Sequence, residues 1–185
     1  MTPNEAEILF QNHWLYFLPI DQDVKRLSRF IEFDECNFLA FSLEMARIMM
    51  TSCAEIDVVM KLYCKELDPD KNPGTIGKYK EIIMDKEPFF FKSYIKMRFH
   101  YNINGLLPWD DWITDPSPCW WQSNNKIKHK RHDNFSKANL ENTLNSVAAL
   151  YALLNCYRQK LIHTYCRNFD PQCDSSVFKY EGSVD

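Results

Sequence analysis

One stretch of the chain, residues 120–135, holds the side chains best suited to chemistry. It opens with two tryptophans and then places four basic residues and two histidines within seven positions, 126–132. The whole chain has a formal net charge of −3, so this positive charge is local. With about 100° per residue, a helix would gather part of the stretch on one face, with Arg131 to the side. That face would carry Trp121, Asn125, Lys128, His129 and His132.

The chemistry that fits this set is metal-independent cleavage of RNA. His129 would act as general base or acid toward a ribose 2′-hydroxyl, with Lys128 and Arg131 stabilising the phosphorane charge. Asn125 would orient His129. Aromatic rings can stack on bases, so four further residues are expected to bind substrate. These are Trp120, Trp121, Lys126 and His132. The alternative is a solvated basic face without a ligand, which is what charge runs usually are.

A second candidate lies in the last predicted helix, where His163 follows Arg158. On an ideal helix the two side chains differ by about 140°, so they would share a cleft only loosely. An ordinary charged helix end is the alternative. Zinc binding by His163, Cys166 and Cys173 has little support, because no compact Cys-x-x-Cys pair is present. We expect no metal and no cofactor, and no glycine-rich loop indicates a nucleotide-binding P-loop or Rossmann fold.

Length and composition predict one ordered, mainly helical domain. The chain has 185 residues, only four glycines, and 13 Phe, 9 Tyr and 5 Trp. We expect a single helical domain at 1–170 and a flexible C-terminal tail at 171–185. Seven scattered cysteines do not form a secreted disulfide framework, and neither a signal peptide nor a membrane-spanning run is evident. A cytoplasmic protein that does not enter a membrane is therefore expected.

Hydrophobic periodicity predicts a helical bundle built on two long antiparallel helices, with a short extended segment near 88–101. The long helices are expected at 34–67 and 136–169, where apolar residues recur every three or four positions. Shorter helices are expected at 4–18, 23–33 and 75–84, the first of them ending at Pro19. Alternating polar and apolar residues at 94–101 favour a strand. Trp109 and Trp112 lie in an irregular segment, as a lid over the site or as core packing.

Each long stripe contains a polar intruder, Glu55 in the first and Arg158 in the second. A carboxylate on a buried stripe is costly unless it is paired, so Glu55 needs a partner. One arrangement pairs Glu55 with Arg158, which would brace the cleft. Another leaves Arg158 facing the same cleft as His129, and Glu55 in a purely structural salt bridge to the next helix.

The stretch has the pattern Trp-Trp-x-x-x-Asn-x-x-Lys-His-x-Arg-x-x-x-Phe-x-x-Ala. The residues that carry it are Trp120, Trp121, Asn125, Lys128, His129, Arg131, Phe135 and Ala138. Together with the two long helices, the pattern resembles the HEPN-like class of all-helical prokaryotic proteins, several of which are linked to toxin–antitoxin and phage-defence systems. The resemblance covers a little under half of the chain.

The resemblance implies a helical bundle, frequently a homodimer with a composite cleft, and in active members a metal-independent RNase. Those members use an arginine followed four to six residues later by a histidine, with a polar residue after the arginine. Arg158, Gln159 and His163 match that arrangement here. The implied partners are RNA or a nucleotide, a second copy of the chain, and a protein of a defence or toxin–antitoxin system. The alternative is a non-catalytic HEPN-like domain that binds a protein or a nucleotide.

Overall fold

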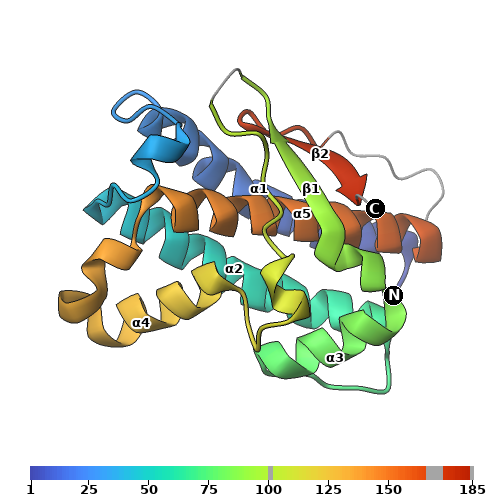
Figure 1. The fold of residues 1–185 in the computed structure, drawn as a ribbon. Coiled ribbons are helices and arrows are strands. Elements are labelled where there is room, and N and C mark those ends of the chain that lie inside the picture. The colour runs from blue at the N-terminus through green and yellow to red at the C-terminus, as the bar shows by residue number, and fades with distance from the viewer. Residues whose placement is uncertain (100–101, 166–172, 184–185) are drawn as a thin grey trace.

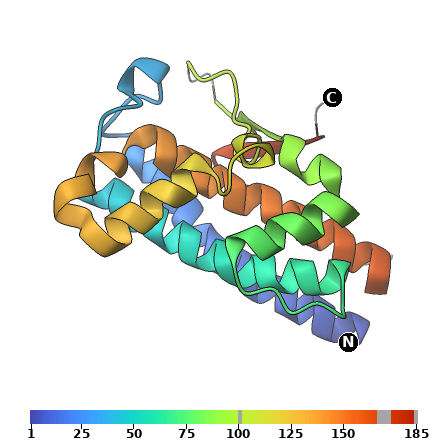
Figure 2. The same ribbon diagram turned by 60° about the horizontal axis from the view of Figure 1, so that its bottom comes forward.

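Three long helices form the body of the protein in this computed structural model, which describes residues 1–99, 102–165 and 173–183. They are α1 (Pro3–Leu27), α2 (Leu43–Leu67) and α5 (Leu140–Tyr165) (Figures 1 and 2). Two shorter helices, α3 (Ile76–Lys86) and α4 (Cys119–Asn134), pack on this group. The prediction of a mainly α fold is confirmed.

Helix α5 lies at the centre of the core, because its sequence is apolar on nearly every side. Every residue from 146 to 155 is buried, including a run of valine, alanine and leucine at 147–150. A helix that is hydrophobic all round needs partners all round. Helices α1, α2 and α4 supply them, together with the small sheet.

The direction of the two predicted long helices was wrong, because α2 and α5 run parallel. Near their N-terminal ends the hydroxyl of Thr143 donates to the carbonyl of Met45 at 3.4 Å. At their C-terminal ends the hydroxyl of Tyr165 donates to Glu66 at 2.8 Å. The antiparallel neighbour of both is α1. The sequence analysis predicted two short helices, at 4–18 and 23–33, in place of this single helix.

Helix α1 continues through Pro19 instead of ending there. Proline removes one backbone hydrogen bond and costs a helix interior about 3 kcal/mol. Phe17, Ile20 and Val24 on either side are almost fully buried, and their burial offsets this cost. The helix begins at a capping box, in which Thr2 and Glu5 each bind the other's backbone N–H.

Helix α2 begins at Leu43, later than the predicted start at 34. The Ser42 side chain accepts a hydrogen bond from the backbone of Met45 at 3.1 Å, which caps the helix. The preceding residues form a short 3₁₀ helix, η1 (Glu35–Asn37), and a loop. The predicted apolar stripe is confirmed within α2, where Met45, Ile48 and Val59 are buried.

The predicted extended segment near 88–101 contains one strand, β1 (Ser93–Met97), preceded by the 3₁₀ helix η2 (Pro88–Lys92). His100 and Tyr101 lie outside the described residues. β1 pairs antiparallel with β2 (Phe178–Ser183), with Ile95 opposite Tyr180. The predicted tail at 171–185 is therefore packed structure across 173–183, and Phe178 is fully buried.

The carboxylate of Asp21 in α1 holds this C-terminal segment against the body. Buried Asp21 accepts from the Ser175 hydroxyl and from the Ser176 backbone N–H, the latter at 2.7 Å. The Ser175 oxygen in turn accepts from the backbone of Phe178 at 2.8 Å. No helix in the described ranges has both the length and the apolar composition that a bilayer span requires.

Candidate functional site

A cluster of buried tryptophans fixes the start of α4. Trp109 and Trp112, the second of them in the 3₁₀ helix η3 (Asp111–Ile113), are fully buried, so both are core packing and not a lid. The ring centroid of Trp109 lies 5.1 Å from that of Trp120. The Asp111 carboxylate accepts from the backbone N–H of Cys119 at 2.7 Å, and burial raises the pKa of that carboxyl.

Helix α4 buries one stripe and exposes the other. Trp120, Ser123, Asn124 and Ile127 recur at helical spacing and face the body. The basic residues are left exposed on the outer face. Trp120 is wrong as a substrate-binding residue, because it is buried and its indole N–H donates to the Pro108 carbonyl at 2.7 Å.

The predicted convergence of Lys128, His129 and Arg131 in one pocket was also wrong. At Lys130 the backbone leaves the helical region (φ −146°, ψ 61°), so the last turn does not continue the outer face. The three side chains line three different hollows. We call them the α4 pocket, the α2–α4 groove and the end pocket.

The α4 pocket, of about 410 Å³, holds His129 beside two lysines. It is lined by Gln122, Asn125, Lys126, His129, Lys130 and Asn134. An imidazole between two ammonium groups can exchange a proton while the cations hold an anion. Asn125 lines the same pocket, so the prediction that it lies near His129 holds, but no hydrogen bond joins them among the described residues.

The α2–α4 groove, of about 460 Å³, combines an indole with amides and one cation. Trp121, Asn124, Asn125 and Lys128 form its α4 wall, and Met50, Ala54 and Asp57 of α2 lie opposite. Trp121 is half-buried and meets Trp120 edge to face at 5.9 Å, which fixes its ring. Of the two tryptophans predicted to bind substrate, Trp121 is the one that lines a hollow.

The end pocket, of about 550 Å³, holds Arg131 and His132 with Leu43 and Phe135. His132 lies 3.3 Å from the Asp133 carboxylate, and both side chains are exposed. Exposed ion pairs are weak, so this contact does little to neutralise the positive charge of residues 126–132.

Glu55 does not brace this region with Arg158. Its carboxylate accepts from the His13 ring nitrogen of α1 at 2.6 Å, and both side chains are largely buried. The sequence correctly marked Glu55 as needing a partner. It missed His13 because nothing local shows that α1 crosses α2 at this level.

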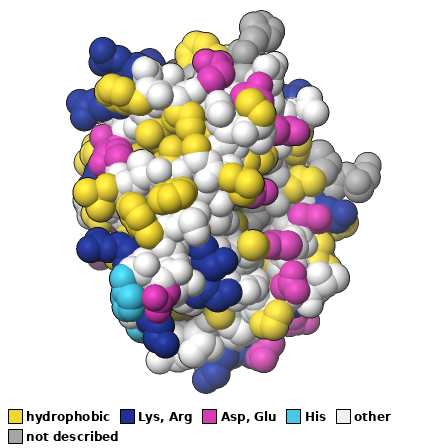
Figure 3. Space-filling model, turned by 60° about the vertical axis from the view of Figure 1, so that its left-hand side comes forward, with side chains coloured by type: hydrophobic (Ala, Val, Ile, Leu, Met, Phe, Trp, Pro, Cys, Tyr) yellow, Lys and Arg dark blue, Asp and Glu magenta, His cyan; other side chains and the backbone are white. Residues whose placement is uncertain are grey.

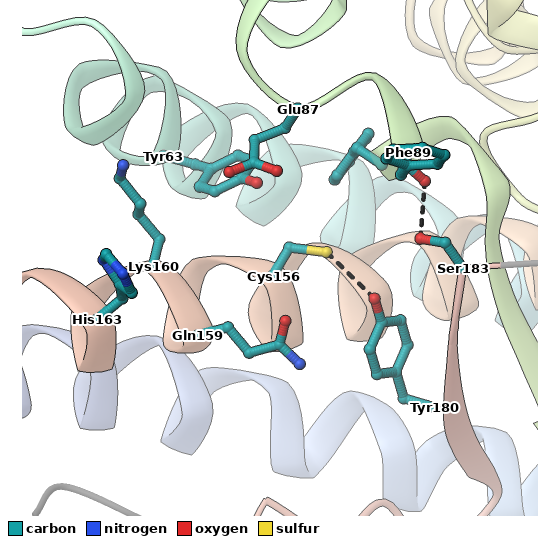
Figure 4. Close-up of a pocket in the computed structure, with 10 residues that line it drawn as sticks. Tyr63, Glu87, Phe89, Cys156, Gln159, Lys160, His163, Tyr180 and Ser183 are labelled. Carbon is teal, nitrogen blue, oxygen red and sulfur yellow. Dashed lines mark hydrogen bonds between the residues drawn. The ribbon is translucent and has the colours of Figure 1, made fainter. Parts of the chain in front are cut away.

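Arg158 and His163 do not line the same hollow, which agrees with the loose sharing of a cleft that their angular separation indicated. His163 lines a fourth hollow, the α5 pocket, of about 380 Å³, whereas Arg158 is not among its lining residues (Figure 4). The pocket also contains Glu87, Cys156, Lys160 and Tyr180, none of which was predicted as functional. Cys156, Lys160 and His163 recur on one helix face, a signal present in the sequence, but Glu87 and Tyr180 join only through the fold.

No three metal-binding side chains gather among the described residues, and Cys166 of the considered zinc set lies outside them. A comparison of the chain with protein-family models, with curated proteins and with solved structures found no match in any of the three. The HEPN-like resemblance therefore stays a prediction.

Proposed function

We propose that the chain is a HEPN-like RNA-binding protein that holds single-stranded RNA along the outer face of α4. The observation that carries this proposal is the unneutralised charge of that helix. Lys126, Lys128, Lys130 and Arg131 are exposed, and none makes an ion pair with a described residue. Four neighbouring cations that form no ion pair with the described acidic residues, on a chain of net charge −3, favour a polyanionic ligand.

The α2–α4 groove adds a reason to favour single strands. An unpaired base can stack on an indole face and be hydrogen-bonded by side-chain amides. Trp121 and Asn125 offer these groups, with Lys128 available for the adjoining phosphate. In a duplex the bases are already stacked, so this groove would contribute nothing.

Cleavage is a second candidate function, favoured because His129 lines the same pocket as Lys126 and Lys130. In this reaction His129 takes the proton of a ribose 2′-hydroxyl, and the resulting oxygen attacks the adjacent phosphorus. The P–O5′ bond breaks, and the leaving oxygen takes a proton from the imidazolium or from water. The lysines stabilise the negative charge of the phosphorane. A toxin or antiphage role, as the resemblance implies, would follow from this activity.

A homodimer, also implied by the resemblance, has a candidate surface beside the cationic helix. Phe30 is 83% exposed, Leu39 78% and Leu43 67%, and Leu43 lines the end pocket with Arg131. Figure 3 shows hydrophobic side chains next to Lys, Arg and His on this side of the molecule. An interface between two copies would cover large exposed apolar side chains such as these.

The test of binding compares two variants with the same change of charge. Fluorescence anisotropy with a labelled single-stranded RNA would measure the RNA affinity of three proteins. These are wild type, Lys126→Ala/Lys128→Ala, and the control Lys25→Ala/Lys78→Ala. Both control lysines are exposed and lie on other helices. We expect the α4 variant to lose at least about tenfold in affinity and the control to stay near wild type. Equal losses in both variants would mean that only net charge matters and would contradict the assignment.

The test of cleavage uses the same RNA with EDTA present. Cleavage by wild type that disappears in His129→Ala and persists in the control Lys25→Ala/Lys78→Ala would support the catalytic version. If wild type leaves every RNA intact under conditions in which it binds, the catalytic version is wrong and the binding version stands.

A further inference from the structure

The α5 pocket joins charged side chains to an aromatic floor, away from the face of α4. Tyr63 of α2 and Phe90 of η2 form its buried part, and both are almost inaccessible. Lys160 and His163 project from α5, while Glu87 enters from the turn between α3 and η2 (Figure 4). An ammonium, an imidazole and a carboxylate therefore line one hollow.

The two opposite charges of this pocket do not bind each other. Among the residues that the structure describes, Lys160 forms no ion pair, and the same holds for Glu87 and His163. Each charged group is thus left with its hydrogen-bonding capacity unused by the protein. A small ligand that satisfies both must carry a negative and a positive group close together.

The pocket has different chemistry along its length. Figure 4 shows Lys160 and His163 together at one end, and Phe89 with Tyr180 at the other. Glu87 lies between the two ends. The ring of Phe89 is 69% exposed, so it offers apolar surface to a ligand. The order along the pocket is cationic, acidic and aromatic.

Cys156 lies in the middle of the pocket but is not a nucleophile. Burial raises the pKa of its thiol to about 11, and its sulfur contacts the Tyr180 hydroxyl at 3.5 Å. The thiol stays neutral at physiological pH. The pocket is therefore a site for reversible binding and not for a covalent intermediate.

We propose that the α5 pocket binds a free α-amino acid with an aromatic side chain. The ligand carboxylate accepts hydrogen bonds from Lys160 and from a ring N–H of His163, which an imidazole can donate in either charge state. The ligand ammonium donates to the Glu87 carboxylate. The ligand ring packs on Phe89 and beside Tyr180. Carboxylate, ammonium and ring of one amino acid thus match the three sections of the wall.

The size of the pocket and the number of its charges favour a free amino acid over a peptide. About 380 Å³ lies at the lower end of the range of small-molecule sites. Either end of a peptide carries only one of the two charged groups, so it would leave Lys160 or Glu87 without a partner. The Phe89 carbonyl accepts from the Ser183 hydroxyl at 2.8 Å, which ties the aromatic wall to β2.

The test is calorimetric titration of the full chain with L-phenylalanine, L-tyrosine and L-tryptophan, followed by three comparisons. The amide of the best binder lacks the negative charge, its N-acetyl form lacks the positive charge, and L-alanine keeps both charges but lacks the ring. We expect wild type to bind at least one aromatic amino acid. The amide and the N-acetyl form should each bind about tenfold more weakly or worse, because a charged hydrogen bond is lost. L-alanine should also bind more weakly, because it makes no contact with Phe89.

Two variants separate the contacts. Lys160→Met should weaken binding of the amino acid but not of its amide, and Glu87→Gln should weaken binding of the amino acid but not of its N-acetyl form. The controls are Lys78→Met and Glu81→Gln, exposed positions of α3 outside this pocket, which should bind as wild type does.

Three results would overturn the proposal. The first is that wild type binds none of the three aromatic amino acids. The second is that the amide, the N-acetyl form or L-alanine binds as tightly as the best binder. The third is that Lys160→Met or Glu87→Gln binds the amino acid with the affinity of wild type.

This inference does not depend on the RNA proposal. Lys126→Ala/Lys128→Ala should keep the affinity of wild type for the amino acid, because these lysines do not line the α5 pocket. Lys160→Met should keep the affinity of wild type for single-stranded RNA. Loss of amino-acid binding in the α4 variant would contradict the assignment of this ligand to the α5 pocket.

Discussion

Among single residues, Glu55 illustrates what the sequence can and cannot reveal. Its place on an apolar stripe predicted burial and a partner, and both are confirmed. The identity of the partner depends on how α1 crosses α2, which no local pattern encodes. For the same reason the sequence analysis offered Arg158 or a salt bridge to the next helix, and did not consider His13.

The His13–Glu55 contact should matter for stability. Replacing His13 with alanine leaves the Glu55 carboxylate buried without its donor, and we expect a loss of about 3 kcal/mol in urea unfolding. The control is Asn12→Ala, on the exposed side of the same turn. Because the cost comes from the orphaned charge, His13→Leu/Glu55→Met should be more stable than His13→Ala. A double variant that is less stable than the single one would contradict this reasoning.

The cysteines should fall into two reactivity classes. Cys53, Cys64 and Cys156 have their thiol pKa raised by burial, so they should resist alkylation at pH 8 until denaturant is added. Mass spectrometry after iodoacetamide treatment should find label on exposed Cys36 and Cys119.

Cys36 offers a finer comparison within the exposed class. Its hydrogen bond with the Asp34 carboxylate raises the thiol pKa, which lowers the thiolate fraction and slows the reaction. Asp34→Asn should therefore speed labelling of Cys36 and leave Cys119 unchanged. Equal rates at Cys36 in the two proteins would show that Asp34 has no influence.

Among elements, α4 departs most from the arrangement that the sequence indicated. The face that helical geometry predicted, with Trp121, Asn125 and Lys128 beside two histidines, is divided among three hollows. The break at Lys130 was not predictable, because nothing in the basic run 126–132 marks a helix end. One non-helical residue moved Arg131 and His132 into a different hollow from His129.

The C-terminal strand β2 was missed because its packing depends on residues far away in sequence. Its register is set by β1, and its entry by Asp21. A short polar segment at a chain end usually frays, and only these distant partners prevent that here.

Asp21→Ala should release this segment. The substitution removes a buried carboxylate that accepts two hydrogen bonds, so we expect about 3 kcal/mol lower stability. Hydrogen exchange at the amides of Val177 and Phe178 should become faster, because Ser175 would no longer be held in place to accept from them. Gln22→Ala, at the exposed neighbouring position, is the control. Unchanged exchange at both amides in Asp21→Ala would rule out this role.

At the scale of the molecule, composition and periodicity were sufficient for the fold class but not for the topology. Few glycines and long apolar stripes predicted a helical bundle. The relative direction of α2 and α5 depends on the segment between them, which contains α3, β1 and α4 and is long enough for either direction. Helical periodicity carries no information about direction, so the antiparallel arrangement was an unsupported choice.

The proposed homodimer is tested by mass in solution. If exposed Phe30 and Leu39 are interface residues, wild type should sediment at twice the mass of the chain, and Phe30→Asp/Leu39→Asp should sediment as a monomer. Leu15→Asp, at an exposed leucine of α1, should leave the mass unchanged. A monomeric wild type at micromolar concentration would contradict the prediction.

The salt dependence of RNA binding tests the central claim most directly. The logarithm of the association constant falls with the logarithm of salt concentration by about 0.7 for each phosphate contact on a single strand. Three to four cations of α4 should give a slope of about −2 to −3, and Lys126→Ala/Lys128→Ala should reduce its magnitude by about 1.4. Binding by wild type with no salt dependence, or the same slope in the variant, would show that these cations do not hold the RNA.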